Sequence, residues 1–272
     1  MHHDELHDHD RGLSHDLPAV LDRRRLLALL GGAGAAALVA CTTEEGTPSS
    51  ASAAGTSGAT TAATTGEQIP EETAGPYPGD GSNGVNVLNR SGIVRGDITG
   101  GFGGASAVAS GVPLTIRLTV LDTKNGSAPL QGAAVYLWHC DIDGAYSLDS
   151  RELTNENYLR GVQAAGADGS LTFTSIFPGA YSGRWPHIHF EVYPSLDKAA
   201  AAVDKLRTSQ LAFPEDACRL VYATSGYERS LRNLGQSSLA SDMVFRDGWS
   251  LQLGTVTGDP TAGMTVALSV PV

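Results

Sequence analysis

Short segments in which apolar and polar residues alternate recur from residue 114 onward, and they constrain the fold of this chain more than any other feature. A period of two is typical of β-strands with one buried face. Turn-forming stretches rich in Gly, Asp and Asn, such as residues 124–127, separate the segments. The expected strands are residues 114–121, 133–138, 171–175, 187–193, 251–256 and 264–270. Many short strands of this kind predict an all-β fold, a β-sandwich of two sheets with long connecting loops.

Composition divides the chain into a leader, a linker and one domain. Residues 68–272 are long enough for a single domain with a real core. Within them, residues 196–206 have the composition of a helix, or of a loop with one helical turn. Residues 42–67 consist mostly of Ser, Thr, Ala, Gly and Pro, which is typical of a flexible tether. We expect this linker and the leader of residues 1–41 to be disordered.

The leader has the features of an export signal. Paired arginines at Arg23 and Arg24 precede an apolar run that is too short for a membrane-spanning helix. This arrangement resembles a twin-arginine (Tat) signal. The sequence Leu-Val-Ala-Cys ending at Cys41 resembles a lipobox, in which the cysteine is lipidated; cleavage nearby with release is the alternative. We therefore expect an exported protein, extracellular or at the cell surface, with a lipid at Cys41 as its membrane attachment.

The charge balance excludes one class of partner. The chain has 18 basic and 29 acidic residues, for a net charge of −11. No cluster of Lys and Arg is present that would follow a phosphate backbone, so nucleic acid is not an expected partner.

The histidine pattern indicates a metal site. Five of the eight histidines precede residue 16, which leaves His139, His187 and His189 in the predicted domain. Residues two apart on a strand point to the same face, so His187 and His189 are expected side by side. Their Cα atoms would lie about 6.5 Å apart, which lets both imidazoles reach one ion. A polar strand face with two ordinary histidines is the alternative.

Two histidines need further ligands, and tyrosines are the nearest oxygen donors. Tyr181 precedes His187 by six residues in a Gly-rich turn that can bring its phenol back towards the strand. Tyr146 follows an Asp-rich turn after the predicted strand of residues 133–138.

Two segments together resemble one enzyme family. Residues 137–146 read Leu-Trp-His-Cys-Asp-Ile-Asp-Gly-Ala-Tyr, and residues 178–190 read Pro-Gly-Ala-Tyr-Ser-Gly-Arg-Trp-Pro-His-Ile-His-Phe. Both resemble the intradiol ring-cleavage dioxygenases, the catechol and protocatechuate 3,4-dioxygenase type enzymes. The resemblance implies a non-haem ferric ion held by two tyrosinates and two histidines, with Tyr181 and His187 as the axial pair and Tyr146 and His189 as the equatorial pair.

The resemblance covers residues 68–272 and implies further site residues. The segment of residues 72–78 resembles the family's pocket entrance, which implies that Gly75 and Pro76 line the substrate cavity. The segment of residues 208–214 resembles the strand that brings a glutamine near the iron, which implies Gln210. Arg184, three residues before His187, matches an arginine that stabilises charge developing on the substrate ring; a surface ion pair is the alternative.

The implied reaction inserts O2 between the two hydroxylated carbons of a catechol and gives a cis,cis-muconate-type diacid. The donor set fits ferric iron, because phenols titrate near pH 10 and two tyrosinates require a strong Lewis acid. The interval from Tyr181 to His187 is shorter than in the cytosolic aromatic-acid enzymes, and Gly183 stands where those carry an aromatic residue. The resemblance therefore implies a catechol as substrate and leaves its ring substituents open.

Two other functions stay open on the sequence. One is an exported sandwich module that binds aromatic compounds without turnover. The other is a zinc hydrolase with two histidines and a carboxylate from Asp141 or Asp143. Separately, Cys140 and Cys218 remain as an even pair in an oxidising compartment, so either a disulfide or two buried small apolar residues is expected.

Overall fold

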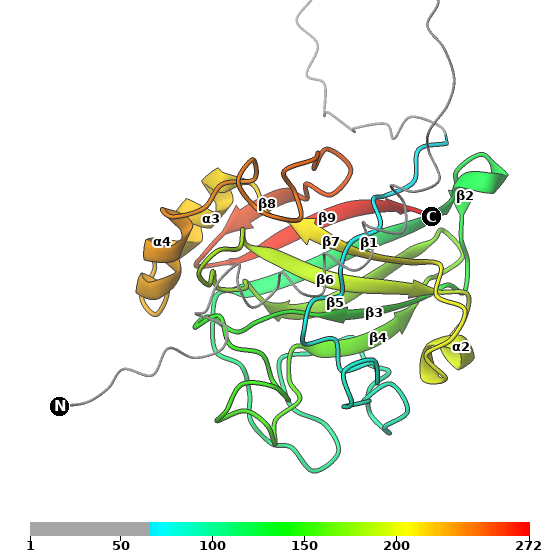
Figure 1. Cartoon of the computed structure of the whole chain (residues 1–272), viewed down its shortest axis with the longest axis horizontal. Coiled ribbons are helices and arrows are strands. Elements are labelled where there is room, and N and C mark those ends of the chain that lie inside the picture. Colours follow the sequence, from blue (N-terminus) through cyan, green and yellow to red (C-terminus); the bar gives the residue numbers. More distant parts are fainter. Residues whose placement is uncertain (1–65) are drawn as a thin grey trace, which may run out of the picture.

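A computed structural model describes residues 66–272, which form two β-sheets with short helices at their ends (Figure 1). The leader, Cys41 and residues 42–65 of the linker lie outside the described residues. The strands are β1 Pro113–Asp122, β2 Ala128–Pro129, β3 Ala134–Trp138, β4 Arg160–Ala164, β5 Ser170–Ile176, β6 His187–Tyr193, β7 Arg207–Ala212, β8 Thr255–Asp259 and β9 Gly263–Pro271. The helices are a 3-10 turn, η2 Thr123–Asn125, and α2 Leu196–Ala200, α3 Glu215–Tyr222 and α4 Glu228–Leu234.

The two sheets have different strand orders. One runs β2-β1-β9-β8, and β5 also pairs with β1; the other runs β4-β3-β6-β7. The β1 and β9 strands are parallel, whereas the other pairs within the sheets are antiparallel. The α3 and α4 helices lie together at one end of the sheets, and α2 lies at the opposite end (Figure 1). The predicted all-β sandwich is confirmed.

The core between the sheets is made by alternate residues of the strands. In β1 the buried residues are Leu114, Ile116, Leu118 and Val120, and in β9 they are Met264, Val266, Leu268 and Val270. The other sheet contributes Val135, Leu137, Ile188, Phe190 and Val192 to the same cluster. These alternations are the sequence signal from which the strands were predicted, because each buried apolar side chain stabilises the folded state by about 1.5–3 kcal/mol.

A second apolar cluster lies on the outer face of the β4-β3-β6-β7 sheet. Tyr136, Trp138 and Tyr193 project from this face and pack against side chains of residues 85–102 and 146–148. Long loops therefore cover a face that would otherwise be open to solvent, and every residue of β6 is buried.

The predicted elements match the structure unevenly. Five of the six predicted strands occur within two residues of the expected bounds, but the segment predicted at 251–256 forms its strand at 255–259. There, Leu253 makes only an isolated bridge to Ala212, so the ladder begins later. In the segment of residues 196–206, only α2 is helical. No helix among residues 66–272 is long and apolar enough to cross a membrane.

Of the two alternatives for Cys140 and Cys218, the disulfide is not formed, because both are free thiols. The Cys140 thiol points to the carbonyl of Gly179 at 3.5 Å, and Cys218 is a residue of α3 that is buried in the apolar core. Burial raises the pKa of both thiols, which keeps them protonated. The alternative of two buried small apolar residues describes them correctly.

His139 joins the two sheets through a buried polar contact. Its Nδ1 bonds the carbonyl of Cys140 at 2.8 Å, and its Nε2 lies 2.7 Å from the hydroxyl of Ser175 in β5. The Nδ1–H therefore donates to the carbonyl, and Nε2 accepts from the serine. Burial lowers the pKa of His139 from 6.5 to about 4, so the imidazole is neutral in the folded protein.

Replacing His139 with Gln is expected to reduce the acid sensitivity of folding. Because the folded-state pKa lies below the unfolded value, the unfolded chain binds this proton first as the pH falls. The contribution of His139 is whole above about pH 6.5 and falls by up to about 3 kcal/mol towards pH 4. Urea unfolding of both proteins at several pH values measures the free energy of unfolding. If that free energy fell equally with decreasing pH in both proteins, the neutral, buried state of His139 would be contradicted.

Candidate metal centre

The site lies on the outer face of the β4-β3-β6-β7 sheet, under the covering loops. Ile188 and Phe190 of β6 point into the core between the sheets. The period of two therefore turns His187 and His189 to the opposite face, where both are at most 3% exposed. The strand thus supplies two imidazoles to a site that is closed to bulk water.

Four side chains predicted as ligands come together at one point. The two Nε2 atoms of His187 and His189 are 3.1 Å apart, and the Tyr181 hydroxyl lies 3.2 Å from Nε2 of His187. The Tyr146 hydroxyl is 3.5 Å from that of Tyr181. Three separate stretches of chain, β6 and the two turns before it, supply these atoms. Two nitrogen and two oxygen donors therefore face one another.

The protonation of the histidines suits metal binding. Nδ1 of His187 makes a short hydrogen bond to the carbonyl of Trp185, so it carries the proton and leaves a lone pair on Nε2. Burial, aided by the Arg184 charge, lowers the pKa of both His187 and His189 well below the usual range. Neutral imidazole is the form that binds metals, and here its free nitrogen faces the other donors.

Packing fixes the second imidazole. The His189 ring stacks on Trp138 with centroids 5.0 Å apart and planes 7° from parallel. Its Nδ1 is buried and has no hydrogen-bond partner among the described residues. The direction of Nε2 is therefore set by the indole and by the strand.

The donor set fits a hard, highly charged cation. Burial raises the pKa of Tyr146 well above its usual value, and the nearby Tyr181 adds to this effect. Ionising both phenols in this enclosed place therefore requires a strong positive charge between them. Two phenolates and two neutral imidazoles suit ferric iron.

The residues that a zinc hydrolase would need are not gathered here. No group of three or more His, Cys, Asp or Glu side chains that could hold a metal occurs in residues 66–272. One Asp141 oxygen accepts the amides of Asp143 and Ala145, and the other accepts the Tyr158 hydroxyl. Asp143 is exposed. Asp141 therefore holds the turn before Tyr146 together, and Asp143 lies at the surface of that turn.

A serine in α4 joins the two turns that carry the tyrosines. The Ser230 hydroxyl accepts the amide of Ala180 and donates to the carbonyl of Ile142, both at 2.9 Å. The turns also cross closely, because a Cβ at Gly179 would lie 2.4 Å from the Ile142 carbonyl oxygen. Only glycine permits this crossing. Nothing in the sequence indicated Ser230, which is distant along the chain from both turns.

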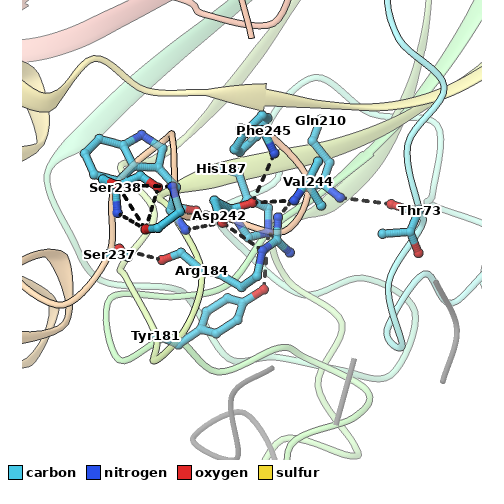
Figure 2. A network of polar contacts seen from close by, with 12 residues as sticks. Thr73, Tyr181, Arg184, His187, Gln210, Ser237, Ser238, Asp242, Val244 and Phe245 are labelled. Carbon is cyan, nitrogen blue, oxygen red and sulfur yellow. Dashed lines mark hydrogen bonds and ion pairs between the residues drawn. The ribbon is translucent and has the colours of Figure 1, made fainter. Parts of the chain in front are cut away.

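Arg184 is buried beside the four donors and is not a surface ion pair. Its Nε donates to Asp242 at 3.0 Å, and one terminal nitrogen, Nη2, donates to Gln210 at 2.6 Å. The other, Nη1, lies 3.4 Å from Nε2 of His187 (Figure 2). Gln210, which pairs with His189 across β6 and β7, also donates to the carbonyl of Thr73 at 2.9 Å. Arg184 and Gln210, which the family resemblance implied, therefore both lie at the site.

The segment predicted as the pocket entrance passes close over the site. Gly75 has a φ of +70°, and a Cβ there would lie 3.3 Å from Cε1 of His189. The carbonyl of Pro76 accepts the side-chain amide of Asn83 at 2.6 Å. The ring of Tyr77, which the sequence analysis did not single out, lies 5.1 Å from that of Tyr146. The segment therefore borders the donors directly.

Arg160 of β4 fastens that entrance segment to the turn after Tyr146. It donates to the carbonyls of Tyr77 and Pro78 at 2.9 and 3.0 Å, and to that of Ser147 at 2.7 Å. Its charge is paired with Asp149 at 3.0 Å. No sequence pattern predicts this role, because the contacts join segments that are far apart along the chain.

The sequence around this site is similar to that of known dioxygenases. A family model described as "Dioxygenase" matches residues 104–227, which include the four candidate ligands, Arg184 and Gln210. The curated chlorocatechol 1,2-dioxygenase of Rhodococcus opacus is 36% identical over 66 residues. That match spans 24% of this chain and 26% of the relative, about a quarter of its length.

Solved structures share the fold. An intradiol ring-cleavage dioxygenase from Tetranychus urticae superimposes with a TM-score of 0.56 at 23% identity, over 75% of this chain and 94% of the other. A second solved dioxygenase gives a TM-score of 0.59 at 22% identity, over 75% of this chain and 93% of the other.

Replacing Ser230 with Ala is expected to loosen the site. The change leaves the amide of Ala180 and the carbonyl of Ile142 buried without their partner, which lowers the free energy of unfolding by about 2 kcal/mol. It also releases the Tyr181 turn, so added ferric iron should be lost faster to a chelator. Urea unfolding and iron retention measure the two effects, with Ser225→Ala, which removes an exposed hydroxyl just before α4, as control. Equal behaviour of the two variants would refute the role of Ser230.

Proposed function

We propose that this chain is a ferric dioxygenase of the intradiol ring-cleavage type, which opens the ring of a catechol between its two hydroxylated carbons; the match to the dioxygenase family model includes all four candidate ligands. The observation that carries the proposal is the convergence of two imidazole nitrogens and two phenol oxygens within 3.1–3.5 Å of their neighbours. Tyr146, Tyr181, His187 and His189 would hold the iron, which supplies the Lewis acidity that stabilises a catecholate. A catechol as substrate is in keeping with the name of the Rhodococcus opacus relative, a chlorocatechol 1,2-dioxygenase.

Tyr181 is the donor best placed to move a proton. Its side chain is 9% exposed, against 1% for Tyr146, so it is the less enclosed of the two phenols. Its hydroxyl borders both Nε2 of His187 and the hydroxyl of Tyr146. Tyr181 Oη would therefore accept a proton from a substrate hydroxyl as the catechol binds.

Arg184 would supply positive charge where negative charge develops on the substrate. Its Nη1 approaches the donor cluster, and the guanidinium is enclosed, which strengthens its field. The Gly75–Pro76 segment would bound the catechol on the His189 side and keep water from it. Both oxygen atoms of O2 end in the product, one in each of the new carboxyl groups.

The location is a separate proposal that rests on the leader sequence. The twin arginines and the Leu-Val-Ala-Cys motif support export and a lipid at Cys41. A Ser/Thr-rich linker of the kind found at 42–67 would then hold the catalytic domain away from the membrane surface.

Visible spectroscopy of the iron-loaded protein tests the proposal. We expect a broad tyrosinate-to-ferric charge-transfer band that moves to longer wavelength when catechol is added without oxygen. Tyr146→Phe and Tyr181→Phe should each change or abolish the band and lower ring cleavage by at least about 100-fold. Tyr227→Phe, which alters a buried tyrosine outside the site, is the control. A protein that stays colourless with ferric iron would refute the proposal and favour binding without turnover.

A further inference from the structure

The Asp242 side chain is almost completely buried, and its two oxygens accept four hydrogen bonds. It lies after α4, beyond residue 227, where the family match ends. Its Oδ2 accepts Nε of Arg184 at 3.0 Å and the amide of Trp185 at 2.6 Å. Its Oδ1 accepts the amides of Val244 and Phe245 at 2.8 and 3.3 Å (Figure 2). The carboxylate is therefore held by its own loop through one oxygen and holds the site through the other.

This arrangement fixes the plane of the guanidinium. Asp242 takes Nε of Arg184, and Gln210 takes Nη2. Gln210 cannot turn freely, because its amide nitrogen is bound to the carbonyl of Thr73. With two of its three nitrogens directed to these acceptors, the planar group presents Nη1 to His187.

The same carboxylate oxygen also acts on the histidine. The Trp185 amide donates to Oδ2 of Asp242, and the carbonyl of Trp185 accepts Nδ1–H of His187. Asp242 therefore steadies the residue whose carbonyl sets the His187 tautomer. The ion pair with Asp242 also supplies the counter-charge of the buried guanidinium.

We propose that Asp242 is a positioning residue, which directs Nη1 of Arg184 at the reacting centre from a part of the chain outside the family match. This inference rests on the proposed function. A charged guanidinium stabilises a transition state only if it is already aimed at the developing charge. Loss of Asp242 should therefore lower kcat for catechol more than it alters KM.

The kinetic test compares Asp242→Asn with the wild-type iron-loaded protein. We expect kcat to fall about 10- to 100-fold while KM for catechol changes less than about threefold. Ser250→Ala, which removes an exposed hydroxyl after the Asp242 loop, should keep the wild-type values. Asp242→Asn leaves a buried guanidinium without its counter-charge and can prevent folding. In that case Asp242→Glu replaces it as the test variant. It should also lower kcat, because the longer side chain displaces the carboxylate.

A double-mutant cycle shows whether the effect passes through Arg184. In an Arg184→Met background, Asp242→Asn should cause no further fall in kcat, because there is no guanidinium left to orient. An equal fall in both backgrounds would overturn the proposal, as would wild-type kcat in Asp242→Asn or in Asp242→Glu.

A second readout does not depend on turnover. In NMR spectra of the metal-free protein, the Nε–H of Arg184 should exchange slowly with solvent, and Asp242→Asn should speed its exchange at least about tenfold. The Nε–H of Arg160, which bonds Ser147 at 3.1 Å, is the internal control and should not change. Unchanged Arg184 exchange would overturn the positioning role. If the wild-type protein shows the expected exchange but cleaves no catechol, the proposed function fails while the geometric role of Asp242 stands.

Discussion

The two-residue period of β6 is the constraint on which the site depends. The strand has a partner on each side, β3 and β7, so its register is fixed by two ladders. Apolar residues on one face anchor it in the core between the sheets, and this forces the intervening residues to the outer face. His187, His189 and Glu191 are therefore held in a row by the same packing that stabilises the sandwich, and a slip of one residue would exchange the two faces.

Polar residues on a buried face require partners, and the structure supplies them from distant segments. Glu191 is fully buried and is bound by Lys205 and by the hydroxyl of Tyr193. Arg160 and Arg184 are both buried, and each is paired with a carboxylate and with neutral oxygen acceptors. Because an unpaired charge in this setting would cost several kcal/mol, the network is expected to hold its geometry closely.

The sequence analysis succeeded where the signal was local. Alternation located β1, β5, β6 and β9, and the resemblance to a known family named the four side chains that converge and the arginine beside them. The sequence analysis missed Ser230, Asp242 and Arg160. Their contacts join residues that are far apart along the chain, and a single serine, aspartate or arginine has no distinctive sequence pattern. The strand near residue 251 was misplaced because the apolar residues Leu251 and Leu253 lie before the start of the ladder at Thr255. The sequence left the pairing of Cys140 and Cys218 open, because a cysteine count says nothing of the distance between two Cα atoms.

The Ser230 contact also has a consequence for the order in which the protein is made. The tyrosine-bearing turns lie before residue 182, but the hydroxyl that joins them belongs to residue 230, and the carboxylate that holds Arg184 belongs to residue 242. A chain emerging from the ribosome has all four donors long before it has the groups that fix them. The finished donor cluster therefore forms only after the chain has been synthesised through residue 242, and capture of a metal in this geometry must follow that point.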